Sequence, residues 1–141
     1  MALKSLFPEE MMEGKSGGAT GLTLETIAGK LTYFHEQLHL LHWQTSSYAE
    51  HVALGGLYDY VHDIKDEIVE KIMGYTGKKP RAFKIEALSD SANSNGVVVA
   101  LITFANQLEE YAEANNMPDI ENISQSLSGE AAKTKFLLTL S

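Results

Sequence analysis

Cysteine is absent from the 141 residues, which excludes disulfide bonds, thiolate metal sites and cysteine nucleophiles. No apolar run approaches the roughly 20 residues that a helix needs to cross a bilayer, so we expect no membrane-spanning segment. Basic residues are also few: 11 lysines and arginines stand against 19 acidic residues, and the net charge is −8. Because nucleic-acid binding needs a basic surface that displaces counterions, the sequence predicts no nucleic-acid partner.

The first 21 residues lack regular patterning. Pro8 and four glycines lie in this stretch without apolar periodicity, which predicts a flexible N-terminal arm over residues 1–21. The stretch also lacks the apolar core of a secretory signal, so we expect a cytoplasmic protein. The remaining length, residues 22–141, suits one domain with a buried core.

No stretch shows the alternating pattern of a β-strand. Apolar residues instead recur every three or four positions in four stretches, which is the pattern of amphipathic helices. The predicted helices run from about Thr23 to Thr45, Glu50 to Gly74, Val97 to Asn115 and Asp119 to Leu140. The sequence therefore predicts an all-α protein, a four-helix bundle.

The connections between these helices differ in length. The apolar pattern is interrupted at residues 45–47, so the connection between the first two helices is short, which predicts an antiparallel hairpin. The next connection, from about Pro80 to Asn95, is long enough to cross the bundle, and residues 83–88 within it are a candidate for a short helix.

Potential metal ligands are concentrated between residues 33 and 75, which hold all five histidines and the only tryptophan. On the first helix, His35, His39 and His42 fall within about 60° of one another around the axis. On the second, Asp66 and Glu70 lie one turn apart, where two carboxylates repel unless a cation or a base lies between them. A solvated acidic face is the other interpretation of that pair. Imidazole and carboxylate ligands together favour iron, manganese or zinc over calcium.

The order of these residues resembles that of a known family. His42-Trp43, then His51 after a short turn, then Asp66 and Glu70 later on the same helix are similar to the ligand pattern of the Dps mini-ferritins. The resemblance implies a ferritin-like bundle that oxidises ferrous iron, favours peroxide as oxidant, and stores ferric mineral in a hollow dodecamer. It implies that His42 and His51 of one subunit and Asp66 and Glu70 of another bind iron. Trp43 would lie beside the site and intercept oxidising equivalents.

The chain also differs from the family pattern. The stretch between His42 and His51 is about three residues shorter, and the family's additional aspartate corresponds here to Gly55. Asp59 and Glu50 are acidic residues near that position, although neither occupies it. No lysine-rich tail is present, so the resemblance does not extend to DNA binding.

Helix geometry independently predicts that such a site needs two chains. His51 and Asp66 are 15 residues apart on one predicted helix, or roughly 22 Å at 1.5 Å per residue. Ligands of one ion lie about 2 Å from it, so these two residues of one chain cannot share a metal. A two-fold axis near the middle of this helix would place His51 of one copy opposite Asp66 and Glu70 of the other. We therefore expect at least a dimer.

Two alternatives remain open. The first is a ferritin-like bundle without redox activity that serves as an assembly or interaction protein, with the histidines packed within an interface. The second is a metal site within one chain, built from His35, His39 and His62, which helix spacing permits.

The charge balance leads to a direct prediction about nucleic acid. We expect no appreciable binding to duplex DNA at physiological salt, because the chain is acidic and its lysines are not gathered into a tail. A gel-shift assay at moderate salt is the measurement, and a tight shifted complex would show the prediction to be wrong.

Overall fold

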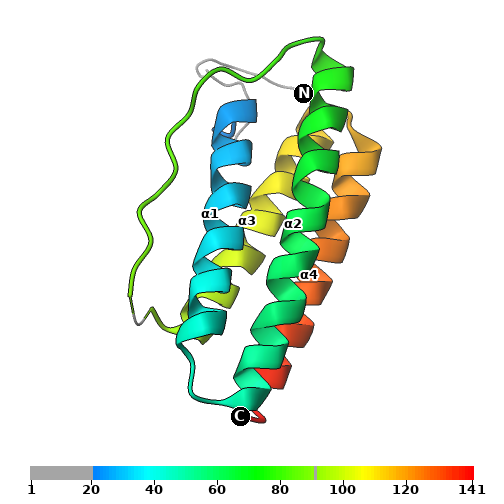
Figure 1. The fold of residues 1–141 in the computed structure, drawn as a ribbon. Coiled ribbons are helices and arrows are strands. Elements are labelled where there is room, and N and C mark those ends of the chain that lie inside the picture. The colour runs from blue at the N-terminus through cyan, green and yellow to red at the C-terminus, as the bar shows by residue number, and fades with distance from the viewer. Residues whose placement is uncertain (1–20, 91) are drawn as a thin grey trace.

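The computed structural model describes residues 21–90 and 92–141, so the expected N-terminal arm lies almost entirely outside the described residues. The described part contains four helices and no strand, which confirms the predicted all-α four-helix bundle (Figure 1). The helices are α1 (Leu24–Gln44), α2 (Tyr48–Thr76), α3 (Ser94–Ala114) and α4 (Pro118–Leu138). Among the described residues, no helix is long and apolar enough to span a bilayer.

Side-chain caps set where three of the helices begin. Thr23, Ser47 and Asn93 each accept a hydrogen bond from the backbone N–H three residues ahead, at 3.1, 3.2 and 2.7 Å. Such caps satisfy one of the free N–H groups of the first turn. At the other end of α2, Gly77 has a φ of 72°, the left-handed conformation that glycine adopts without steric cost.

The core lies along the axis between all four helices. Each helix packs on two neighbours: α1 contacts α2 and α3, and α4 contacts the same two helices. Leu31, Leu54, Leu101 and Leu127, one from each helix, are fully buried there. The apolar positions spaced three and four apart thus form one continuous core, as the sequence pattern predicted.

Every pair of neighbouring helices is antiparallel, because one long connection crosses the length of the bundle. Residues 45–47 join α1 to α2 in the predicted hairpin, whereas residues 77–93 run from the far end of α2 alongside α1 to the start of α3 (Figure 1). We call residues 77–93 the crossover segment; residue 91 within it is not described.

The short helix predicted over residues 83–88 does not form, so that prediction is wrong. The crossover segment instead bonds to α1 on both sides of this stretch. Glu25 accepts a hydrogen bond from the Arg81 N–H at 2.7 Å. The fully buried Gln37 exchanges two bonds with the backbone of Ser89, at 2.8 and 3.0 Å. Nucleating a single helical turn costs more free energy than its few hydrogen bonds return. The bonds to α1 therefore decide the conformation of residues 83–88.

Gly29 provides a test of this contact. A Cβ at Gly29 would lie 2.7 Å from the backbone oxygen of Lys84, so Gly29→Ala must displace the crossover segment or α1. We expect it to lower the free energy of unfolding by about 1–2 kcal/mol despite alanine's better helix propensity. Gly129→Ala on α4, where a Cβ would meet nothing within 4 Å, is the control and should raise it by about 0.5–1 kcal/mol. Urea unfolding of both variants measures the difference, and two variants of equal stability would contradict the contact.

Candidate metal site

His42 and His51 form a tightly fixed pair. The hairpin turn brings the last turn of α1 against the first turn of α2, and the two imidazole rings stack with centroids 3.7 Å apart. Nδ1 of His42 lies 2.6 Å from the backbone oxygen of His51, and Nδ1 of His51 lies 2.8 Å from the backbone oxygen of His42. Each histidine therefore holds the ring of the other.

This reciprocal bonding fixes the chemistry of both rings. A carbonyl oxygen only accepts, so each Nδ1 must carry the proton and donate it. In the neutral ring, the remaining nitrogen, Nε2, then has a free lone pair. Metal-binding histidines in proteins are held in the same way, with the other ring N–H donated to a carbonyl or carboxylate. The pair thus offers two neutral nitrogen donors in a fixed orientation.

Gly55 makes room for this arrangement. A Cβ at Gly55 would lie 3.0 Å from Cε1 and 3.2 Å from Nδ1 of His42, so the imidazole ring rests directly on the glycine backbone. The resemblance pairs Gly55 with an aspartate ligand, and here the His42 ring packs closely over this position. Glu50, one of the nearby acids, accepts hydrogen bonds from the hydroxyls of Thr45 and Ser94 and so joins the hairpin to α3.

Asp66 and Glu70 lie far from the histidine pair. Both carboxylates are exposed on α2, and neither makes an ion pair or hydrogen bond within the part of the chain that the structure describes. Because α2 is one continuous helix from Tyr48 to Thr76, the 15 residues between His51 and Asp66 still correspond to roughly 22 Å. The structure therefore brings together His42 and His51 but not the four predicted ligands.

The other three histidines extend a row of rings along α1 and α2. His35 lies 5.8 Å from His39 and 5.0 Å from His62, and Tyr58 stacks on His39 at 4.2 Å between ring centroids. Burial lowers the pKa of the His35 ring, while the nearby Glu36 carboxylate opposes the shift. No three histidine, aspartate or glutamate side chains in residues 21–90 and 92–141 converge to hold a metal ion, which does not favour a site within one chain.

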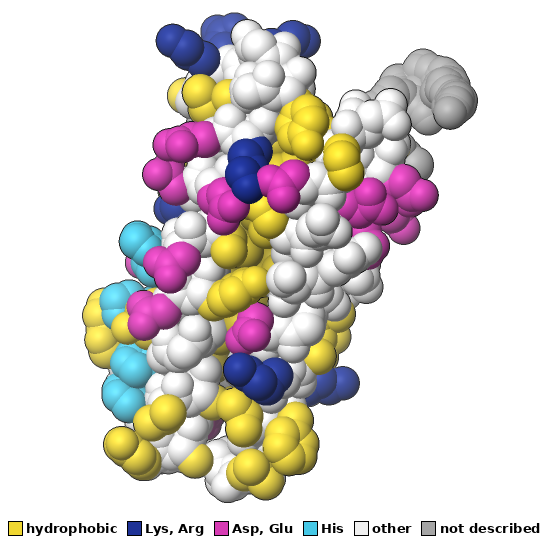
Figure 2. Space-filling view, turned by 90° about the vertical axis from the view of Figure 1, so that its right-hand side faces the viewer, with side chains coloured by type: hydrophobic (Ala, Val, Ile, Leu, Met, Phe, Trp, Pro, Cys, Tyr) yellow, Lys and Arg dark blue, Asp and Glu magenta, His cyan; other side chains and the backbone are white. Residues whose placement is uncertain are grey.

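Trp43 packs beside the middle of this row, on His39. Its side chain is 65% exposed, and its ring centroid is 3.8 Å from that of His39. Figure 2 shows the histidine side chains gathered along one edge of the molecule, beside several acidic side chains. The tryptophan is thus accessible to solvent and in contact with the histidine row.

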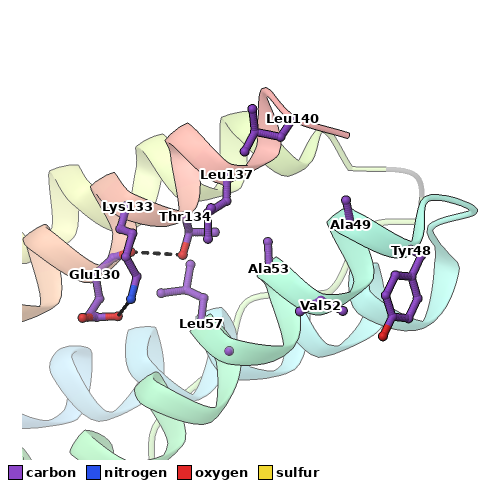
Figure 3. A pocket seen from close by; sticks show the side chains of 11 residues that line it. Tyr48, Ala49, Val52, Ala53, Leu57, Glu130, Lys133, Thr134, Leu137 and Leu140 are labelled. Carbon is purple, nitrogen blue, oxygen red and sulfur yellow. Dashed lines mark hydrogen bonds and ion pairs between the residues drawn. The ribbon is translucent and has the colours of Figure 1, made fainter.

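A groove between α2 and α4 was not predicted from the sequence. It has a volume of about 560 Å³ and lies beside the hydrophobic band that Figure 2 shows between these helices. Small residues on α2 face the last turns of α4 across it, with the Glu130–Lys133 ion pair at one end (Figure 3). The only signal for it is the spacing of Ala49, Ala53 and Gly56 along one side of α2.

Comparison with known proteins places the chain in a family. Residues 42–138 match the model of a family of unknown function, DUF5856. The chain belongs to this family. The matched region begins at His42 and contains Trp43, His51, Asp66 and Glu70, together with the whole of α2, α3 and α4. No curated protein and no solved structure matches the chain.

The two adjacent glycines of α2 allow a matched test of the histidine pair. Gly56→Ala adds a methyl group where nothing lies within 4 Å, so we expect it to stabilise α2 by about 1 kcal/mol. Gly55→Ala should lose that gain and shift the ring resonances of His42 and His51, because its Cβ would contact the His42 ring. Urea unfolding and two-dimensional NMR of the imidazole nitrogens measure both effects. Unchanged ring resonances in Gly55→Ala would show that the ring does not rest on the glycine.

Proposed function

We propose that this protein is a Dps-like ferroxidase that binds ferrous iron as substrate and stores or detoxifies it. The site is shared between two copies, with His42 and His51 from one and Asp66 and Glu70 from the other. The observation that carries the proposal is the reciprocal bonding of the two histidines, which leaves both Nε2 atoms free.

The four residues suit ferrous iron as a group. Two neutral imidazoles supply nitrogen donors, and two carboxylates supply the negative charge that stabilises a cation as its charge rises on oxidation. Zinc and manganese accept the same ligands and serve as mimics. The absence of an intrachain partner for Asp66 and Glu70 also supports the proposal, since neither carboxylate is used within the described part of its own chain.

A two-fold axis near the middle of α2 completes the site. Packing α2 antiparallel against α2 of a second copy brings the start of one helix to the second half of the other. The midpoint between His51 and the two carboxylates falls near Tyr58 and Tyr60, both half-buried in the single chain. Symmetry then creates two equivalent sites in each dimer. A dodecamer would be built from six such dimers.

Trp43 is the residue that we assign to oxidative chemistry. Its ring touches the histidine row and is exposed. It is therefore placed to donate an electron to an oxidant that still lacks one electron after iron oxidation. The histidines and carboxylates bind and orient the iron, whereas the tryptophan protects the surrounding protein.

A second candidate function is an assembly protein without redox activity. The observation in its favour is Gly55, where the His42 ring packs closely over the position of a further carboxylate ligand. Under this alternative the histidine row packs against another protein surface and iron is not oxidised.

Metal titration of paired variants tests the proposal. The wild-type protein freed of metal should bind ferrous iron, or zinc as mimic, with micromolar or tighter affinity, whereas His51→Ala and Asp66→Ala should each lose binding. Mixing these two variants should restore one of the two sites in the heterodimer, because that site then has all four of its ligands. Glu113→Ala, at an exposed carboxylate on α3 away from the site, is the control and should bind as wild type.

Calorimetry measures the affinity, and absorbance on addition of ferrous iron and peroxide measures oxidation. No restoration on mixing would contradict the shared site. Metal binding without iron oxidation would favour the assembly protein.

A further inference from the structure

The middle of the crossover segment presents a free backbone edge. Residues 82–88 are all exposed, and Phe83, Ile85 and Leu88 place apolar side chains at the surface. No hydrogen bond to the backbone of residues 82–88 exists within the described part of the chain, whose backbone bonds elsewhere lie in helices, caps and turns. The carbonyl of Lys84 faces Gly29 of α1, whereas unpaired N–H and C=O groups on the solvent side of such a segment can pair with another chain as those of an edge strand do.

This edge is held in place at both ends. The bonds from Arg81 to Glu25 and from Ser89 to Gln37 fasten the segment to α1 on either side of it. Between them, the backbone of Lys84 lies against Gly29. Folding has therefore already ordered the edge, so a partner that pairs with it does not have to fix a mobile loop.

The charges on the edge are complementary to themselves. Lys84 and Glu86 flank Ile85, and neither forms an ion pair within residues 21–90 and 92–141. In an antiparallel pair centred on Ile85, Lys84 of each copy lies opposite Glu86 of the other. Opposite charges directly across a pair of strands stabilise it, whereas like charges destabilise it. The same arrangement occurs twice around the axis, as a symmetric contact between identical chains requires.

We propose that residues 82–88 form a second self-association surface, on which the same segment of another copy pairs antiparallel about a two-fold axis at Ile85. This surface lies along α1 and is separate from the α2–α2 contact proposed for the metal site. One two-fold contact produces a dimer, and a second, different one joins dimers into larger assemblies. The proposal goes beyond the iron site and holds whether or not iron binds.

A single engineered cysteine detects this pairing directly, since the protein has no cysteine of its own. Residues facing each other across an antiparallel pair have Cα atoms about 4.5–5.5 Å apart, within the range of a disulfide. Ile85→Cys should therefore form a covalent dimer rapidly under mild oxidation at micromolar protein. Val99→Cys, at an exposed position on α3, is the control and should cross-link only at the rate of random collision. Equal rates for the two variants would overturn the proposal.

Charge reversal then tests the register. With Ile85→Cys present, Lys84→Glu or Glu86→Lys alone places like charges opposite each other twice, and cross-linking should slow about tenfold. An equimolar mixture of the two reversed chains should cross-link as heterodimers at the original rate, because each heterodimer again has two opposite-charge pairs. Circular dichroism confirms that each variant keeps its helices. Single reversals without effect, or a mixture that stays slow, would contradict the pairing about Ile85.

Discussion

The continuity of α2 is the constraint on which the arrangement of this protein depends. Its 29 residues form one helix that contacts both α1 and α4 and carries candidate ligands near its start and in its second half. A straight helix cannot bring those two groups together, because its length separates them by roughly 22 Å. In the site that we propose, each of these two groups is therefore one half, and a second copy of the helix supplies the other half.

The two histidines of the hairpin orient each other within a single chain. In many small proteins a histidine at a helix end is free to rotate, but here the backbone carbonyl of one histidine orients the ring of the other. The arrangement depends on the missing side chain of Gly55, since a Cβ there would lie only 3.0 Å from Cε1 of the His42 ring. The glycine therefore lets the ring pack directly against the backbone of α2.

Much of the fold could be predicted from the sequence because helix periodicity is a local signal. The predicted ends of the first helix, Thr23 and Thr45, are the residues that cap α1, whereas α2 and α3 begin two to three residues earlier than their apolar patterns suggest. Those two beginnings are set by the caps of Ser47 and Asn93, which lie outside the apolar pattern.

Long-range contacts explain what the sequence did not reveal. The prediction of a helix over residues 83–88 was wrong because the side chain of Gln37, 52 positions away in the sequence, bonds to the backbone of Ser89 and fastens the segment to α1. The ligand types at His42, His51, Asp66 and Glu70 were visible as a pattern, but the mutual bonding of the histidines was not, since it depends on the backbone of the hairpin turn. The groove between α2 and α4 was missed because small residues on one helix do not show what lies opposite them.

If one chain holds only half of a metal site, zinc binds only where two copies meet, and native mass spectrometry measures this. Each species is observed separately, so the number of metal ions on monomers and on larger assemblies is read in one experiment. We expect zinc on dimers or larger species, at one ion per chain, and none on the monomer. Zinc bound to monomers as readily as to dimers would contradict it.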